Sequence, residues 1–352
     1  MRARRFGVTL AVSAASAALA LGVAACGGDD NKTSSGGNTA GGGDGSDVTV
    51  GLVSDVGKFN DRSFNQAALE GLERAESELG VKGSPIESAA AGDYIPNLTT
   101  LARKKTSLSI GVGFLMADGI DTVATKFPKQ NFAIVDFSQA GLKHKPKNVR
   151  GLTFATNENS YLIGYMAAKM AEEKNKNAPV ISAVGGMKIP TVEIFIAGYK
   201  AGALAANPKT KVLIGYSQEF VAQDKCKELA LNQIQQGSQV VFQVAGGCGL
   251  GALSAAKEKG VWGVGVDRDQ SDLGDHILTS AVKRVDTAVY DSAKDVVDGN
   301  FTGGDKLYDL KSDGVALGKI SPKVPKELVD EVNGLKEKII NGEIKDIPTT
   351  VS

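Results

Sequence analysis

Carboxylates follow two of the apolar runs that we expect to be β-strands. Asp136 ends the run NFAIVD (131–136), and Asp267 and Asp269 come directly after the run at 261–266. A carboxylate at a strand end can accept hydrogen bonds from a ligand or cap a turn, and position alone favours neither. Two carboxylates at one strand end suit the vicinal diol of a sugar, because each can accept a hydrogen bond. They would also suit a metal ion, but no histidine or third carboxylate lies nearby at ligand spacing. We therefore expect neither a metal nor a cofactor.

An irregular loop of polar and aromatic residues follows another apolar run. Residues 54–65 read SDVGKFNDRSFN and lead into a helical pattern, which Ser63 is well placed to cap. Capping accounts for Ser63, but it does not account for two phenylalanines and two asparagines gathered at the start of one helix. These side chains are therefore candidates for contact with a ligand.

Glycines follow the apolar run at 240–244. Residues 245–249 read AGGCG and precede a helical pattern. Glycine lets the backbone approach a ligand closely, and the N–H groups at a helix N-terminus can bind it. A tight turn would use the same glycines, so both interpretations stay open.

Apolar runs and helical patterns alternate along most of the chain, as in parallel sheets built from βαβ units. In such sheets ligands bind beyond the carboxyl ends of the strands, which is where the residues described above lie. Strands are predicted at 48–54, 108–112, 131–136, 180–184, 212–216, 240–244 and 261–266. Helices are predicted at 64–79, 120–127, 157–173, 192–206, 225–236 and 250–259.

Two series of these units indicate two α/β lobes, at residues 47–153 and 154–280. The remaining residues, 281–352, contain helical patterns at 285–298 and 323–341. We expect this last part to close the lobes and to cross between them.

The first residues have the features of an export signal. Three arginines within the first five residues precede an uncharged apolar run at 8–23, and small residues lie just before Cys26. The run is shorter than the roughly 20 residues of a membrane-spanning helix, so residues 1–25 are predicted to be a cleaved signal peptide. The sequence VAAC resembles the lipobox of bacterial lipoproteins, in which Cys26 would become the lipidated N-terminus. An ordinary signal peptide with a coincidental cysteine is the alternative.

The composition sets further limits on function. Residues 26–46 are mostly Gly, Asp, Asn, Ser and Thr, which cannot bury apolar surface, so we expect a flexible tether. The whole chain of 352 residues is 42% hydrophobic, which is typical of a globular protein. Its 40 basic residues are balanced by 40 acidic ones. No basic excess is present to neutralise a phosphate backbone, which argues against nucleic acid as a partner.

Four segments together resemble a known family. They are SDVGKFNDRSFN, GVGFLMADGIDTVATKFPKQNFAIVD, VAGGCGLGALSAAKEKGVWGVGVDRDQ and LTSAVKRVDTAVY. They are similar to the BMP (basic membrane protein) family, the PnrA-like substrate-binding lipoproteins of ABC transporters, over residues from about 48 to about 319. The resemblance implies an α/β fold of the periplasmic-binding-protein type I-like class. Two Rossmann-like lobes with parallel sheets would be joined by a hinge and hold the ligand in the cleft.

The resemblance also implies a function. Characterised members of the family bind purine or other nucleosides and deliver them to a permease. This chain would then be a lipid-anchored binding protein on the extracytoplasmic face of the cell membrane. Its partners would be a small-molecule ligand, most simply a purine nucleoside, and ABC permease subunits. By the same analogy it would work as a monomer and without a cofactor.

The residues that would bind the nucleobase follow from the same analogy. Asp55, Asn65 and Asp136 would hydrogen-bond the base. Phe64 would stack on one face of the base, and Phe220 from the other lobe would stack on the opposite face. The loop after residue 216 reads SQEFVAQDKCKE, whereas many members of the family have an F-x-D-P-type turn there.

The residues that would bind the sugar come from the second lobe and the segment after it. Gly246 and Gly247 would let the backbone approach the sugar, and Asp267 and Lys283 would bind the ribose hydroxyls.

Two cysteines remain if Cys26 carries lipid. Cys226 and Cys248 lie near the starts of helices that follow successive strands of one lobe. Because the protein would be exported, we expect these two cysteines to form a disulfide. Two buried thiols are the alternative.

Two other classes of function are alternatives. An enzyme is not expected, because the sequence has neither a GxSxG motif nor a P-loop, and neither His144 nor His276 has an obvious nucleophile nearby in sequence. A ligand sensor for a membrane receptor, or a receptor for a sugar or other small molecule, would use the same fold. The identity of the ligand would separate these possibilities.

Overall fold

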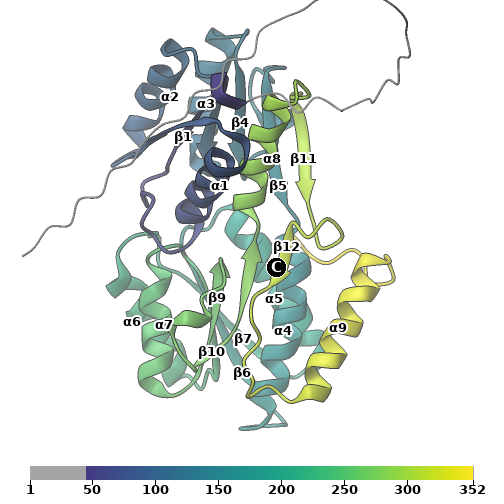
Figure 1. The fold of residues 1–352 in the computed structure, drawn as a ribbon. Coiled ribbons are helices and arrows are strands. Elements are labelled where there is room, and N and C mark those ends of the chain that lie inside the picture. Colours follow the sequence, from purple (N-terminus) through teal and green to yellow (C-terminus); the bar gives the residue numbers. More distant parts are fainter. Residues whose placement is uncertain (1–44, 352) are drawn as a thin grey trace, which may run out of the picture. The chain divides into compact units, whose positions relative to one another are not determined.

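The computed structural model describes residues 45–351, and these form two α/β lobes (Figure 1). The predicted signal peptide (1–25), the lipidation site Cys26 and the tether up to residue 44 lie outside the described residues. Within the described residues, no helix is long and apolar enough to cross a membrane.

The first lobe is built on a parallel sheet with the strand order β11-β5-β4-β3-β1-β2. Its strands are β1 (Thr49–Val53), β2 (Lys82–Ile86), β3 (Leu108–Val112), β4 (Asn131–Val135), β5 (Val149–Phe154) and β11 (Gly304–Tyr308). Its helices are α1 (Phe64–Leu79), α2 (Tyr94–Arg103), α3 (Ala117–Lys126) and α8 (Val285–Val297). The central strand β3 is buried along its whole length because helices cover both faces of the sheet.

The second lobe repeats this plan with the strand order β12-β10-β9-β8-β6-β7. Its strands are β6 (Val180–Gly185), β7 (Lys211–Tyr216), β8 (Val240–Val244), β9 (Trp262–Asp267), β10 (Ile277–Lys283) and β12 (Val315–Leu317). Its helices are α4 (Thr156–Glu172), α5 (Pro190–Ala206), α6 (Gln223–Gln235), α7 (Gly249–Lys259) and α9 (Lys326–Ile340). Strand β12 runs antiparallel to β10, whereas the other strand pairs of this sheet are parallel.

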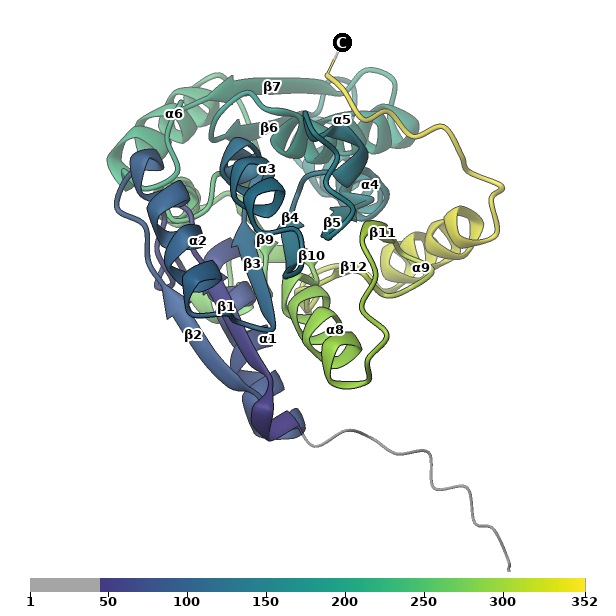
Figure 2. The ribbon, with the colours of Figure 1, turned by 90° about the horizontal axis from the view of Figure 1, so that it is seen from above.

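The chain crosses between the lobes three times within the described residues. The crossings follow β5, β10 and β11, and they are hydrogen-bonded to their neighbours. The N–H of Ala155 donates to the carbonyl of Tyr308, and the N–H of Arg284 donates to the carbonyl of Gly314. These crossings form the hinge. The last part of the chain is therefore divided, with α8 and β11 in the first lobe and β12 and α9 in the second (Figure 1). In the view from above, α8 and β11 lie near each other at the side of the molecule where α9 also lies (Figure 2).

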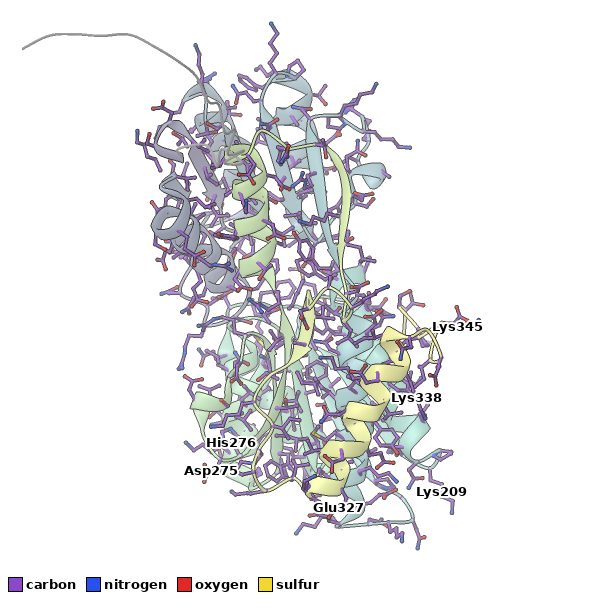
Figure 3. The ribbon with its side chains drawn as sticks, turned by 45° about the vertical axis from the view of Figure 1, so that its right-hand side comes forward. Lys209, Asp275, His276, Glu327, Lys338 and Lys345 are labelled. Atoms are coloured by element: carbon purple, nitrogen blue, oxygen red, sulfur yellow. A yellow bond between two sulfur atoms is a disulfide. The ribbon has the colours of Figure 1, made fainter. Side chains whose placement is uncertain are left out.

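The outer helices show how the sequence directs this packing. Helix α9 packs against α4, burying Leu328, Val332 and Ile339. Glu327 and Lys338 lie on its exposed side (Figure 3). This division into an apolar and a charged face is typical of a helix that covers one side of a lobe.

Glycines allow α4 and α5 to pack closely in the second lobe. A Cβ atom on Gly164 of α4 would lie 1.9 Å from the carbonyl oxygen of Tyr199. A Cβ on Gly202 of α5 would lie 1.8 Å from the carbonyl oxygen of Tyr161. The two backbones thus approach to a distance that only glycine permits.

We expect Gly202→Ala to destabilise the protein by about 1–3 kcal/mol or more, because the added methyl group must push α4 and α5 apart. The matched control is Gly334→Ala in α9, where an added Cβ meets nothing within 4 Å. The control should instead stabilise the protein by about 0.5–1 kcal/mol. Urea unfolding measures the change in the free energy of unfolding for each variant. Equal changes in the two variants would contradict the close packing of α4 and α5.

Candidate functional site

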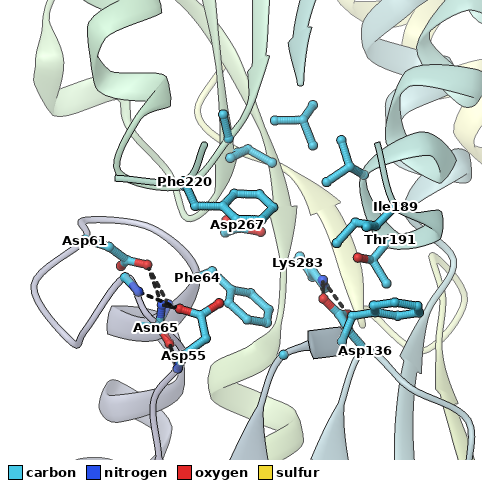
Figure 4. Close-up of a pocket in the computed structure, with 18 of the residues that line it drawn as sticks. Asp55, Asp61, Phe64, Asn65, Asp136, Ile189, Thr191, Phe220, Asp267 and Lys283 are labelled. Carbon is cyan, nitrogen blue, oxygen red and sulfur yellow. Dashed lines mark hydrogen bonds and ion pairs between the residues drawn. The ribbon is translucent and has the colours of Figure 1, made fainter. Parts of the chain in front are cut away.

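A cavity of about 70 Å³ lies where the carboxyl ends of the two sheets face each other (Figure 4). A second cavity of about 170 Å³ adjoins it and shares Asp136, Thr191 and Lys283. Among the residues predicted from the sequence, the first cavity is lined by Asp55, Phe64, Asn65, Asp136, Phe220, Gly246, Asp267 and Lys283. Gly247 lies beside the cavity lining, where a Cβ atom would be 3.5 Å from the carbonyl oxygen of Phe220.

An ion pair between the lobes lies at the inner end of the cavity. The ammonium group of Lys283, at the end of β10, lies 2.6 Å from both carboxylate oxygens of Asp136, which follows β4. Both side chains are buried, at 3% and 9% exposed. Burial raises the pKa of Asp136, and the attraction of Lys283 opposes that rise. The same ammonium group lies 4.8 Å from the ring centre of Phe64 and 5.7 Å from that of Phe195, within the range of cation–π attraction.

Two phenylalanine side chains face the cavity from opposite lobes. Phe64 is the first residue of α1 in the first lobe, and Phe220 lies in the loop between β7 and α6 of the second lobe. Figure 4 shows the two rings on opposite sides of the cavity. The part of the cavity between these two rings is called the slot below.

A network of three polar side chains holds one edge of this slot. The amide nitrogen of Asn65 donates to Asp55 at 2.7 Å and to Asp61 at 3.0 Å, and its oxygen accepts the backbone N–H of Asp55. Both N–H groups of the Asn65 amide are therefore engaged, so its role in this structure is to orient the two carboxylates. Burial raises the pKa of Asp55 to about 6, although hydrogen bonds from Gly57 and Asn65 favour the ionised form.

The start of α1 differs from the sequence prediction. The predicted cap, Ser63, makes no capping hydrogen bond with its side chain. Asp61 takes that role, because its carboxylate accepts the backbone N–H groups of Ser63, Asn65 and Gln66. The Ser63 hydroxyl instead donates across the cleft to Asp267 at 2.5 Å. The sequence already contained a signal for this cap, because Asp61 lies two residues before Ser63 and aspartate caps helices at least as well as serine.

The two lobes carry an aspartate at equivalent strand ends. Asp136 follows β4 with φ of 71°, and Asp267 ends β9 with φ of 64°. A positive φ is uncommon for non-glycine residues, and aspartate is one of the few that adopt it readily. Burial raises the pKa of Asp267 to about 6, although Lys283 and the Ser63 hydroxyl favour its ionised form.

Further lining residues were not predicted from the sequence. Ile189, Thr191, Val192 and Phe195 come from the start of α5, which follows β6. Phe114 and Leu115 come from the short helix η3 (Phe114–Met116), which follows β3. These residues could have been predicted from their position, because they follow the carboxyl ends of parallel strands, where ligands bind.

Cys226 and Cys248 are joined by a disulfide, with their Cα atoms 5.6 Å apart. Both residues are fully buried between α6 and α7. Within residues 45–351, no group of three or more His, Cys, Asp or Glu side chains is placed to hold a metal ion.

Comparison with known proteins connects this geometry to a family. The family described as "ABC transporter substrate-binding protein PnrA-like" matches residues 48–349. The chain belongs to this family. That confirms the family expected from the sequence, and PnrA-like proteins bind substrates rather than acting as enzymes.

Two curated relatives support the membership in the PnrA-like family. The chain is 36% identical over 322 residues to a "CD4+ T-cell-stimulating antigen" of Listeria monocytogenes, covering 85% of this chain and 88% of that protein. It is 37% identical over 322 residues to the "ABC transporter nucleoside-binding protein BmpA" of Lactococcus lactis, covering 85% and 89%.

A solved structure matches this PnrA-like protein closely. A solute-binding protein of an ABC transporter system from Aeropyrum pernix superposes with a TM-score of 0.79 and 29% identity, covering 86% of this chain and 94% of that one. The fold is that of the periplasmic binding proteins of the type I-like class, as the sequence predicted.

The raised pKa of Asp267 predicts how the stability of the ligand-free protein depends on pH. Burial favours the protonated form of Asp267 in the folded protein. The free energy of unfolding that the protonated carboxyl group contributes is fully present below the ordinary aspartate pKa, and it is lost as the pH rises toward about 6. Asp267→Asn cannot ionise, and asparagine tolerates the positive φ. The stability of the variant relative to the wild type should therefore increase by up to about 3 kcal/mol between pH 4 and pH 7.

Urea unfolding of both proteins at a series of pH values measures this difference. A difference that stays constant or decreases as the pH rises would contradict the prediction.

Proposed function

We propose that this protein is a lipid-anchored receptor on the extracytoplasmic face of the membrane that captures a purine nucleoside and delivers it to an ABC importer. The observation that carries the proposal is the slot between Phe64 and Phe220, whose rings face the cavity from opposite lobes. The printed name of the Lactococcus lactis relative, a nucleoside-binding protein, supports the same ligand class. The lipobox at Cys26 supports the anchor.

Aromatic stacking explains why closure of the lobes would depend on the ligand. A base stacked on an aromatic side chain contributes roughly 1–3 kcal/mol. Because one ring comes from each lobe, a base gains both contacts only when the lobes are closed. The cavity of about 70 Å³ is smaller than the roughly 300 Å³ or more of a typical ligand pocket. A nucleoside would therefore enter an open form, and the hinge crossings would let the lobes close over it.

The charges of the pocket favour a neutral ligand that is rich in hydrogen-bond donors. Asp55, Asp61, Asp136 and Asp267 line the cavity, and Lys283 is paired with Asp136. The N–H groups of a base and the hydroxyls of a ribose would donate to these carboxylates. A phosphate group would be repelled by them, so the same pocket would reject nucleotides.

A thermal-shift panel tests the ligand class. The protein, freed of bound ligand by unfolding and refolding, is melted with nucleosides, free bases, sugars and nucleoside monophosphates. A purine nucleoside at 100 times its Kd should add roughly 2.7 kcal/mol and raise the midpoint by about 5 °C. The monophosphates and sugars should give no shift. A shift with sugars and none with nucleosides would overturn the proposal.

Removal of one stacking ring should weaken binding without unfolding the protein. We expect Phe64→Ala to raise the Kd for the nucleoside about 5- to 150-fold, as measured by calorimetry. Phe127→Ala is the matched control, because Phe127 packs partly buried at the end of α3 and does not line the cavity. The control should leave the Kd unchanged, and an unchanged Kd in Phe64→Ala would exclude this ring from the site.

Affinity should also fall in acid. Asp55 and Asp267 are much stronger hydrogen-bond acceptors when ionised than when protonated, and the pKa of each is raised to about 6. At pH 5 the Kd should therefore be at least about ten times that at pH 7.5. Calorimetry at several pH values measures this change, and a Kd that falls on acidification would show that the protonated carboxyls bind the ligand instead.

A further inference from the structure

The loop that carries Phe220 is joined to the sheet at its start, where the backbone N–H groups of Ser217 and Gln218 donate to the carbonyl oxygens of Gly185 and Gly186. Residues 217–222 follow β7, which is the edge strand of the second sheet, so a neighbouring strand lies on one side only. Gln218 in this loop has a positive φ of 58°. The side chain of Phe220 is partly exposed, and its ring packs close to the backbone at Gly186, where a Cβ would lie 2.3 Å from the ring atom Cε1.

Several hydrogen bonds fix the loop from within and from the next loop. The carboxylate of Glu219 accepts the backbone N–H groups of Phe220 and Val221, both at 3.0 Å. The carbonyl oxygen of Phe220 accepts the N–H of Cys248 at 2.9 Å. Cys248 lies at the N-terminus of α7, directly after Gly246 and Gly247. The Phe220 loop and the glycine loop of the pocket therefore meet at Cys248.

The disulfide adds a covalent link between Cys248 and the helix that follows the Phe220 loop. Cys248 is bonded to Cys226, which lies in the first turn of α6, the helix that follows the Phe220 loop. The hydroxyl oxygen of Ser217, at the start of the same loop, lies 3.4 Å from one sulfur and 3.6 Å from the other. One covalent link thus ties the end of the loop to the residue that holds the carbonyl of Phe220.

We propose that the Cys226–Cys248 disulfide is a positioning element for ligand binding, which holds the ring of Phe220 in place for stacking. The ligand part of this inference rests on the proposed nucleoside function. The disulfide itself does not touch the cavity, so it acts through Phe220.

A double-mutant cycle separates positioning from general stability. In Cys226→Ala/Cys248→Ala, measured well below its melting midpoint, the Kd for the purine nucleoside should rise about five-fold or more. In the Phe220→Ala background the same two substitutions should change the Kd less than about two-fold, because the ring that they position is gone. Equal effects in both backgrounds, or no effect in either, would overturn the proposal.

Ile234→Ala is the matched control for stability. Ile234 packs against the same small apolar cluster from the last turns of α6, away from the disulfide. This variant should melt at a lower temperature with an unchanged Kd. A rise in Kd equal to that of the double alanine variant would show that loss of stability alone weakens binding, and would overturn the proposal. If the double alanine variant does not fold, the variant Cys226→Val/Cys248→Ala is used in its place in every measurement, because valine restores part of the lost side-chain volume.

Hydrogen exchange gives a readout that needs no ligand. Removal of the disulfide should increase amide exchange at Phe220 and Val221 at least about ten-fold, and leave amide exchange in α3 of the first lobe unchanged. Unchanged exchange at Phe220 would overturn the proposal. If the wild type binds no nucleoside at all, the proposed function fails, while the exchange result still decides whether the disulfide orders the loop.

Discussion

Lys283 ends a strand of the second lobe and buries its ammonium group against Asp136 of the first. A charge in such a desolvated place is costly unless a partner neutralises it, so the two lobes meet in the arrangement that brings these residues together. The rings of Phe64, Phe154 and Phe195 surround the same ammonium group. The pair therefore links the hinge strand β10, the stacking ring of α1 and the start of α5, and it lies where the two adjoining cavities meet.

The pocket concentrates groups that do not favour folding. Asp55 and Asp267 are held where burial disfavours their charge, and Asp136 and Asp267 have a positive φ, which few non-glycine residues adopt. The parallel topology explains this concentration, because it brings the carboxyl ends of both sheets to one place. Hydrogen bonds from Asn65, Gly57 and Ser63 keep the carboxylates oriented as acceptors. A site made in this way is ready to receive donors, since the orientation of its acceptors is already fixed.

The apolar runs of the sequence were enough to predict the parallel α/β lobes, because apolar residues predominate in buried strands such as β3 and β8. Strand β2 was missed because it lies at a sheet edge, is partly exposed and contains glycine and proline. The exposed edge strand β11 was missed for a similar reason. Ser63 was misassigned because its hydroxyl bonds Asp267, which is 204 residues away. Contacts of that kind depend on tertiary structure, and local pattern does not contain them.

The hinge crossings have a consequence for how the chain can be assembled. The first lobe begins at β1, yet its edge strand β11 ends at Tyr308, after nearly all of the second lobe. A chain that emerges N-terminus first, from a ribosome or through a membrane pore, therefore cannot complete its first lobe until the second has emerged. Neither lobe can be isolated by a single cut, and the order of synthesis makes the two lobes finish folding almost together.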